Sequence, residues 1–196
     1  MIRIGSLFSG IGAFEEALRQ LDIPYKITFA CDNGEIELVL LDNQKDRREY
    51  IDLNRRVRKL DTRESNRLKY YKKIINKHVE EIRNYCYALS TKEERIQFVN
   101  DLYLHYEGRR RNYVKESYLA NYKINPNDFH TDIRFMRGDD YAGQVDILVG
   151  GSPCQSFSTY GKKQGLEDAR GTLFYDYARI IKETQPKVFI YENVAA

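Results

Sequence analysis

The chain has 196 residues, of which 42% are hydrophobic and 31% charged, with a net charge of +3. This composition is typical of a soluble globular protein with one good core. No apolar stretch approaches the roughly 20 residues of a membrane helix, and the first residues do not form a signal peptide. The three cysteines, Cys31, Cys86 and Cys154, lack metal-ligand spacing, so they predict a reduced, cytoplasmic protein without zinc or a disulfide framework.

The N-terminal residues predict a strand over 2–8, a glycine loop, and a helix from about residue 14 to 21. Such a unit binds polar ligands with its backbone N–H groups and its helix N-terminus. A second strand is predicted over 25–30, followed by Asp32. This carboxyl lies 20 residues beyond Gly12, close to the spacing of the acidic residue that binds ribose hydroxyls in Rossmann-type units. The alternative is that Asp32 caps a helix that follows it.

The middle of the chain, residues 45–123, contains 21 Lys and Arg against 12 Asp and Glu, a net charge of +9. Leu68, Ile75, Val79, Ile82, Cys86 and Leu89 recur at helical spacing, which predicts one amphipathic helix. Residues 90–93 have the form of a capping box that opens a second helix. We therefore expect a helical insertion. It is either a solvated hairpin that is braced on the fold, or a subdomain that contacts the DNA backbone through basic runs such as 55–59 and 109–111.

Cys154 lies in the most informative segment, Val-Gly-Gly-Ser-Pro-Cys-Gln-Ser-Phe-Ser over residues 149–158. It follows an apolar run over 146–149 that predicts a buried strand, so it lies where a sheet presents side chains to a ligand. Two glycines and Pro153 beside a thiol are typical of a nucleophile rather than a core cysteine. A further strand over 187–191 ends at Glu192, which places a carboxyl at the same edge of the sheet. Residues 155–170 predict a loop that closes over a substrate, or a plain surface loop.

These motifs occur together in an ordered series. The series consists of residues 6–15, 29–32, 130–133, 150–158, 165–174 and 192–194. In this order they resemble the cytosine-C5 DNA methyltransferases over residues 1–44 and about 124–196. The resemblance implies an α/β, Rossmann-like S-adenosylmethionine-dependent methyltransferase fold, incomplete at the C-terminus. The expected division is a catalytic, cofactor-binding domain of 1–44 plus 124–196, with the helical insertion of 45–123.

The resemblance also implies roles for single residues and S-adenosylmethionine as the cofactor. Cys154 would add to C6 of a flipped cytosine, and Glu192 would hydrogen-bond or protonate N3. Asp132 would accept a hydrogen bond from the exocyclic amine of the cofactor's adenine. The implied cofactor-binding residues are Phe8, Ser9, Gly10, Gly12, Asp32, Asn33, Asp132, Ile133, Pro153 and Leu173, and the implied DNA-binding residues are Gln155, Ser158 and Arg170. No metal is implied. Asn33 departs from the family, which often has a side chain there that stacks on the adenine.

The resemblance further predicts that the chain is the N-terminal half of an enzyme, either a fragment or one subunit. Its expected partners are double-stranded DNA and a C-terminal target-recognition half, and the 196 residues alone are not expected to methylate DNA. The activity would be DNA cytosine methylation, and a restriction-modification system is one expected setting for it. Two alternatives stay open, a tRNA cytosine-C5 methyltransferase and a non-catalytic cofactor-binding half.

Overall fold

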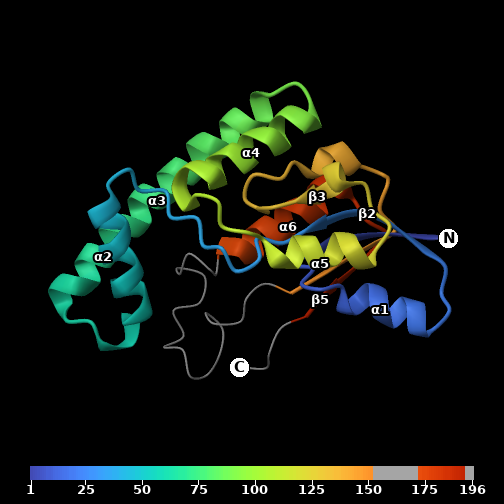
Figure 1. Cartoon of the computed structure of the whole chain (residues 1–196), viewed down its shortest axis with the longest axis horizontal. Helices are drawn as coiled ribbons and strands as arrows, with labels where there is room; N and C mark the ends of the chain where they lie inside the picture. Colours follow the sequence, from blue (N-terminus) through green and yellow to red (C-terminus); the bar gives the residue numbers. More distant parts are fainter. Residues whose placement is uncertain (152–171, 193–196) are drawn as a thin grey trace.

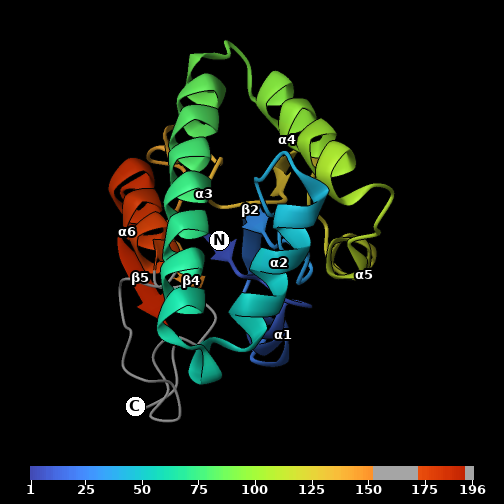
Figure 2. The ribbon, with the colours of Figure 1, turned by 90° about the vertical axis from the view of Figure 1, so that its left-hand side faces the viewer.

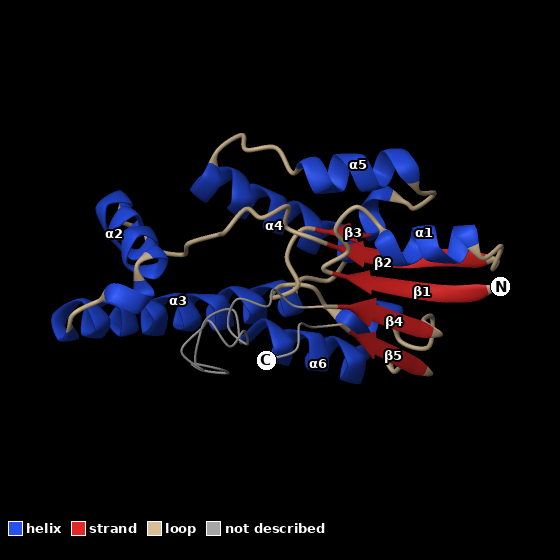
Figure 3. Ribbon diagram, turned by 90° about the horizontal axis from the view of Figure 1, so that it is seen from below, coloured by secondary structure: helices blue, strands red, loops and turns tan. Residues whose placement is uncertain are grey.

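A computed structural model describes residues 1–151 and 172–192 of the chain. The described residues form a five-stranded sheet in the order β3-β2-β1-β4-β5, in which every neighbouring pair is parallel. The strands are β1 (Ile2–Leu7), β2 (Tyr25–Cys31), β3 (Phe129–His130), β4 (Ile147–Gly150) and β5 (Val188–Tyr191). The expected α/β fold with a parallel sheet is therefore confirmed, and the strand arrows point the same way in Figure 3.

Helices cover both faces of the sheet, as in α/β folds where crossover connections bury both sides. On one face, α1 (Ala13–Gln20) and α5 (Tyr113–Asn121) pack against β1 and β2 through Leu18 and Tyr118. On the other face, α6 (Thr172–Thr184) packs through Tyr177 and Ile180. The same face holds the short 3₁₀ helix η3 (Gly138–Tyr141), and a further one, η2 (Pro126–Asp128), precedes β3.

The predicted insertion is helical and larger than the two helices expected from sequence. It contains α2 (Gln44–Arg55), the 3₁₀ helix η1 (Val57–Lys59), α3 (Thr62–Ala88), α4 (Lys92–Glu107) and α5. A separate core joins α2, α3 and α4, and it includes Tyr50, Tyr71 and Val99. Figures 1 and 2 show α3 as the longest helix, with α2 packed beside its N-terminal half. The domain limits at residues 44 and 123 stay a prediction.

The predicted capping box of the second helix is wrong by one residue. The N-cap of α4 is Thr91, whose hydroxyl accepts from the Glu94 backbone N–H, while the Glu94 carboxylate accepts from the Thr91 N–H. Ser90 with Glu93 and Thr91 with Glu94 both fit the capping-box pattern of Ser or Thr followed three residues later by Glu, so the pattern alone does not distinguish the two registers. The structure forms the reciprocal bonds at Thr91 and Glu94, and the helix that starts at Lys92 buries Val99 and Tyr103.

Candidate functional site

The strand order reverses at the pair formed by β1 and β4. From β1 the chain moves outward to β2 and β3, and from β4 it moves outward on the other side to β5. In open parallel sheets the crevice beyond the carboxyl ends of the strands at such a switch point is where ligands bind. The glycine loop follows β1 there, and Gly151 follows β4 at the same edge, which we call the carboxyl edge.

The loop after β1 has an unusual backbone. Phe8, Gly10 and Gly12 have φ angles of 52°, 52° and 88°, the left-handed region that a bulky residue such as Phe8 rarely adopts. Strained backbone of this kind is found at ligand-binding sites, where the surrounding structure imposes it. A methyl group built on Gly10 would meet no atom of a described residue within 4 Å, so the described part of the chain leaves open space at that residue. The geometry gives a ligand direct access to the backbone.

Asp32 ties this loop to the end of β2. One oxygen of its carboxylate accepts from the Gly10 N–H at 2.9 Å, and the other accepts from the Gly34 N–H at 2.8 Å. No helix begins within residues 33–43, so the alternative role of Asp32 as a helix cap does not apply. Asn33 accepts from the Glu35 N–H and donates to the Ile36 carbonyl, which shapes the same turn. The carboxylate therefore lies beside the loop, as the ribose role requires.

The apolar residues predicted to contact a cofactor lie around one cluster. Phe8 and Leu173, the latter in the first turn of α6, are partly buried and pack against the core that contains Ile133. Ser9 donates its backbone N–H to the Cys31 carbonyl, which continues the β1–β2 pairing into the loop. The structure thus brings Phe8, Ser9, Ile133 and Leu173 to one region, although they are far apart in sequence.

Asp132 has a structural role that the sequence did not reveal. Its buried carboxylate forms an ion pair with Arg134 at 2.7 Å and accepts from the Tyr103 hydroxyl of α4 at 2.9 Å. Arg134 also donates to it through its backbone N–H and its Nε. These donors use most of the lone pairs of a carboxylate. The contact of Asp132 with an adenine amine stays a prediction.

Glu192 follows β5 at the carboxyl edge, and its backbone N–H donates to the Gly150 carbonyl. Its carboxylate lies against Gly151, since a methyl group built on Gly151 would be 2.8 Å from the Glu192 Oε2. Gly151 precedes Cys154 by three residues in the sequence. The predicted residues Pro153, Cys154, Gln155, Ser158 and Arg170 lie outside the described residues.

The two residues that cap helix α5 contact the glycine loop and the end of β2, which the sequence did not indicate. The Tyr122 hydroxyl donates to the Gly12 carbonyl at 2.8 Å, and the Asn112 side-chain amide donates to the Asp32 carbonyl at 2.9 Å. Between them, the buried Tyr118 hydroxyl donates to the Glu15 carboxylate of α1 at 2.6 Å. A side chain at Gly12 would collide with the Tyr122 ring, so this glycine is required by packing as well as by its φ angle. The end of the insertion thus braces the loop.

His130, in the motif that contains Asp132, is buried and lies 2.7 Å from the Tyr141 hydroxyl through its Nε2. Burial, aided by the nearby Lys92 charge, lowers the pKa of His130 to about 3. The unfolded chain has a histidine pKa of about 6.5. Below about pH 6.5 the unfolded chain takes up a proton at this histidine, whereas the folded protein keeps the ring neutral. The stability that the neutral ring provides is therefore fully present above about pH 6.5, and it is lost as the pH falls toward 3.

We expect the free energy of unfolding to decline between pH 7 and pH 5, and to decline less in His130→Gln. Urea unfolding at several pH values checks this, with His105→Gln, at an exposed histidine of α4, as the matched control that keeps the wild-type slope. An equal decline in wild type and His130→Gln would contradict the assignment.

Among residues 1–151 and 172–192, no group of three or more His, Cys, Asp or Glu side chains is arranged to hold a metal ion. Cys31 and Cys86 are free and buried, and burial raises the pKa of Cys86 to about 11. In the same part of the chain, no helix is both long and apolar enough to cross a membrane.

Residues 107–196 match the family described as C-5 cytosine-specific DNA methylase. The chain is similar to the Type II methyltransferase M.NgoPII of Neisseria gonorrhoeae, with 46% identity over 79 residues, covering 39% of this chain and 23% of that protein. It is 45% identical over 82 residues to the Type II methyltransferase M.HhaI of Haemophilus parahaemolyticus, covering 42% of this chain and 24% of that protein. With the orphan methyltransferase M.SPRI of Bacillus phage SPR it shares 61% identity over 51 residues, covering 26% of this chain and 12% of that protein.

Each of these alignments spans less than a quarter of the relative's own length.

Proposed function

We propose that the chain is the cofactor-binding and catalytic part of a DNA (cytosine-5-)-methyltransferase, because residues 107–196 match the family described as C-5 cytosine-specific DNA methylase. The observation that carries the proposal is the glycine loop braced by Asp32 at the switch point of the sheet. Relatives named Type II methyltransferases support a place in a restriction-modification system.

The residues of the loop fit S-adenosylmethionine. The open space at Gly10 admits a ligand to the backbone, and Asp32 provides a carboxylate for ribose hydroxyls. Phe8, Ile133 and Leu173 provide apolar contacts, and Ser9, Gly12, Asn33 and Pro153 complete the proposed set, with Asp132 as a further candidate. When bound, S-adenosylmethionine supplies an electrophilic methyl group for C5 of the target cytosine.

The chain's own residues make C5 reactive. The thiolate of Cys154 forms a bond to C6, and the electron pair of the C5–C6 double bond moves toward C5. Glu192 donates a hydrogen bond or a proton to N3, which draws charge from the ring during the attack. After methylation a base removes the C5 proton, the double bond reforms, and the thiolate leaves. The target base must be flipped out of the duplex to reach the thiol, for which Gln155, Ser158 and Arg170 are the proposed DNA contacts.

We expect the 196-residue chain to bind S-adenosylmethionine, and Asp32→Asn to bind it about tenfold more weakly or worse. The substitution removes the charge that faces the ribose, and it sets an amide N–H against the N–H of Gly10 or Gly34. Isothermal titration measures both affinities.

The matched control is Asp22→Asn, at the far end of α1. Asp22 has a positive φ angle of 52°, which asparagine tolerates, so the fold should be kept. This variant should therefore keep wild-type affinity. Absence of binding in the wild-type chain, or equal binding by Asp32→Asn, would contradict the proposed cofactor site.

A further inference from the structure

The distal half of the insertion has a strong excess of positive charge. We call residues 44–77 the basic arm; it comprises α2, η1 and the N-terminal half of α3. It contains 13 Lys and Arg and 5 Asp and Glu, a net charge of +8, whereas the rest of the chain, with 19 and 24, has a net charge of −5. The arm is therefore the reason why the net charge of the whole chain is positive.

The acidic residues of the arm are already engaged within it. Arg67 lies within 4 Å of Asp46 and Glu49, and Arg56 forms ion pairs with Asp52 and Glu64. The remaining acidic residue, Asp61, caps α3 by accepting from the Glu64 N–H. Two arginines thus satisfy four of the five carboxylates, and most of the cations are left uncompensated.

Several of these cations are exposed on both helices of the arm. Lys45, Arg48, Lys69 and Lys73 are exposed, and their side chains form no ion pair with a described residue. Most apolar residues of the arm, among them Tyr50, Leu68 and Tyr71, are buried between α2, α3 and α4, whereas Tyr70 is 55% exposed. The outer surface is therefore cationic with little apolar area, which suits a polyanion and gives a membrane little to bury.

The base of the arm is held firmly on the catalytic fold. Arg83 of α3 forms a 2.7 Å ion pair with the buried Asp176 of α6 and donates to the Arg134 carbonyl. The buried Arg95 of α4 forms an ion pair at 2.6 Å with Asp140, which is partly buried. Such pairs on two helices fix the direction of α3 relative to the sheet, so the cations beyond them have a defined position.

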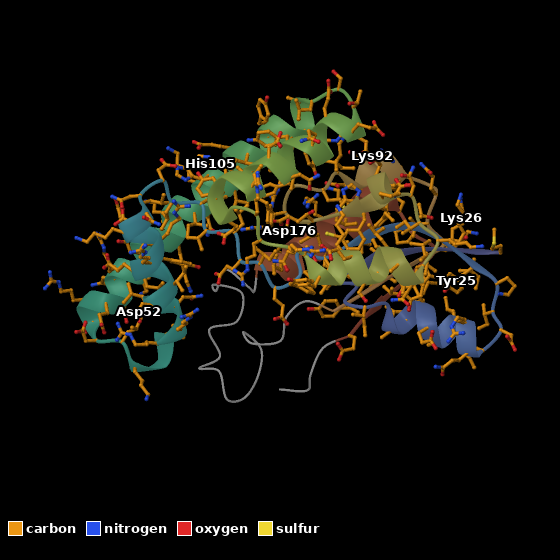
Figure 4. All side chains as sticks on the ribbon, viewed as in Figure 1. Tyr25, Lys26, Asp52, Lys92, His105 and Asp176 are labelled. Atoms are coloured by element: carbon orange, nitrogen blue, oxygen red, sulfur yellow. The ribbon has the colours of Figure 1, made fainter. Side chains whose placement is uncertain are left out.

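The arm extends past the carboxyl edge of the sheet. In Figures 1 and 3 the strands point toward the side on which α2 and the start of α3 lie, well beyond the strand ends. In Figure 4 Asp52 marks the arm, while Lys26 lies at the opposite end of the molecule. At 1.5 Å per residue the 27 residues of α3 span about 40 Å, comparable to about 12 base pairs of duplex.

We propose that the basic arm binds the phosphate backbone of duplex DNA beside the target base. The proposal rests on the proposed function, which brings DNA to the carboxyl edge. Exposed lysines and arginines there neutralise phosphates without reading bases, so the arm contributes affinity and orientation rather than sequence recognition. It also gives the insertion a role that a solvated hairpin would not have.

The test compares two triple variants of the 196-residue chain that remove equal charge. The arm variant changes Arg48, Lys69 and Lys73 to Gln; the control variant changes Lys26, Lys123 and Lys182, exposed cations outside the arm, to Gln. Fluorescence anisotropy with a 24-base-pair duplex is measured from about 50 to 200 mM salt, because each phosphate contact contributes about 0.9 to the slope of log K against log salt.

We expect the arm variant to bind duplex DNA at least tenfold more weakly, with a salt slope reduced by about 1 to 3, and the control variant to stay within about threefold of wild type. Circular dichroism verifies that both stay helical, and titration with S-adenosylmethionine verifies the cofactor site independently. If both variants lose affinity equally, or if the arm variant loses none, the arm does not bind DNA, even where cofactor binding upholds the proposed function. Tighter arm-dependent binding of a tRNA than of the duplex would also overturn the proposal.

Discussion

Replacing Cys154 with serine abolishes methyl transfer in the complete enzyme and leaves S-adenosylmethionine binding nearly intact; this is the largest effect that we expect. A serine hydroxyl is a far weaker nucleophile than a thiolate, so the bond to C6 does not form. Apart from Pro153, which the substitution leaves unchanged, the proposed cofactor contacts come from other segments, so they are kept. Methyl transfer to duplex DNA, isothermal titration with the cofactor, and covalent trapping on 5-fluorocytosine DNA measure the three quantities.

Cys86→Ala is the matched control for this variant. Cys86 is a fully buried thiol of α3, and burial raises its pKa to about 11, so it stays protonated and inert at neutral pH. Its removal should change stability but leave the activity of the folded enzyme within a fewfold of wild type. Retained turnover in Cys154→Ser, or persistent trapping, would disprove the nucleophile assignment.

Glu192→Gln is expected to slow methyl transfer by about 10² to 10⁴, the usual contribution of a positioned general acid. Glutamine keeps the shape of the side chain and one hydrogen bond but has no proton to give to N3. The position of Glu192 at the end of β5, against Gly151, is what makes this effect specific to it. Single-turnover rates with saturating DNA and cofactor measure the change.

Glu93→Gln, at an exposed position on α4, serves as the control and should keep the wild-type rate. A loss below tenfold in Glu192→Gln would mean that the carboxyl only stabilises the end of the strand. A lower midpoint of urea unfolding without a loss of rate would support that structural role.

The sequence by itself determined the parallel α/β class, the main strands and the order of the motifs. Apolar runs such as 146–149 and 187–191 identify strands of a parallel sheet. The first run forms the central strand β4, whereas the second forms the edge strand β5, which leaves Val188, Phe189 and Ile190 exposed. The glycine loop, Asp32 and Glu192 could be assigned to one edge of the sheet, because every parallel strand ends on the same side. The assignment of Cys154 to the same edge stays a prediction. Local patterns therefore sufficed wherever the chemistry follows a strand end directly.

Only the tertiary structure decided what the insertion does to the site and what Asp132 contacts. Tyr122 and Asn112 reach Gly12 and Asp32 across 110 and 80 residues, and Tyr103 reaches Asp132 from a different helix. Helical periodicity indicates which residues of a helix are buried, but it does not say which surface covers them. The projection of the basic arm past the carboxyl edge depends in the same way on ion pairs between distant segments, Arg83 with Asp176 and Arg95 with Asp140. Such partners are chosen by packing between elements, and the sequence near each residue contains no signal for them.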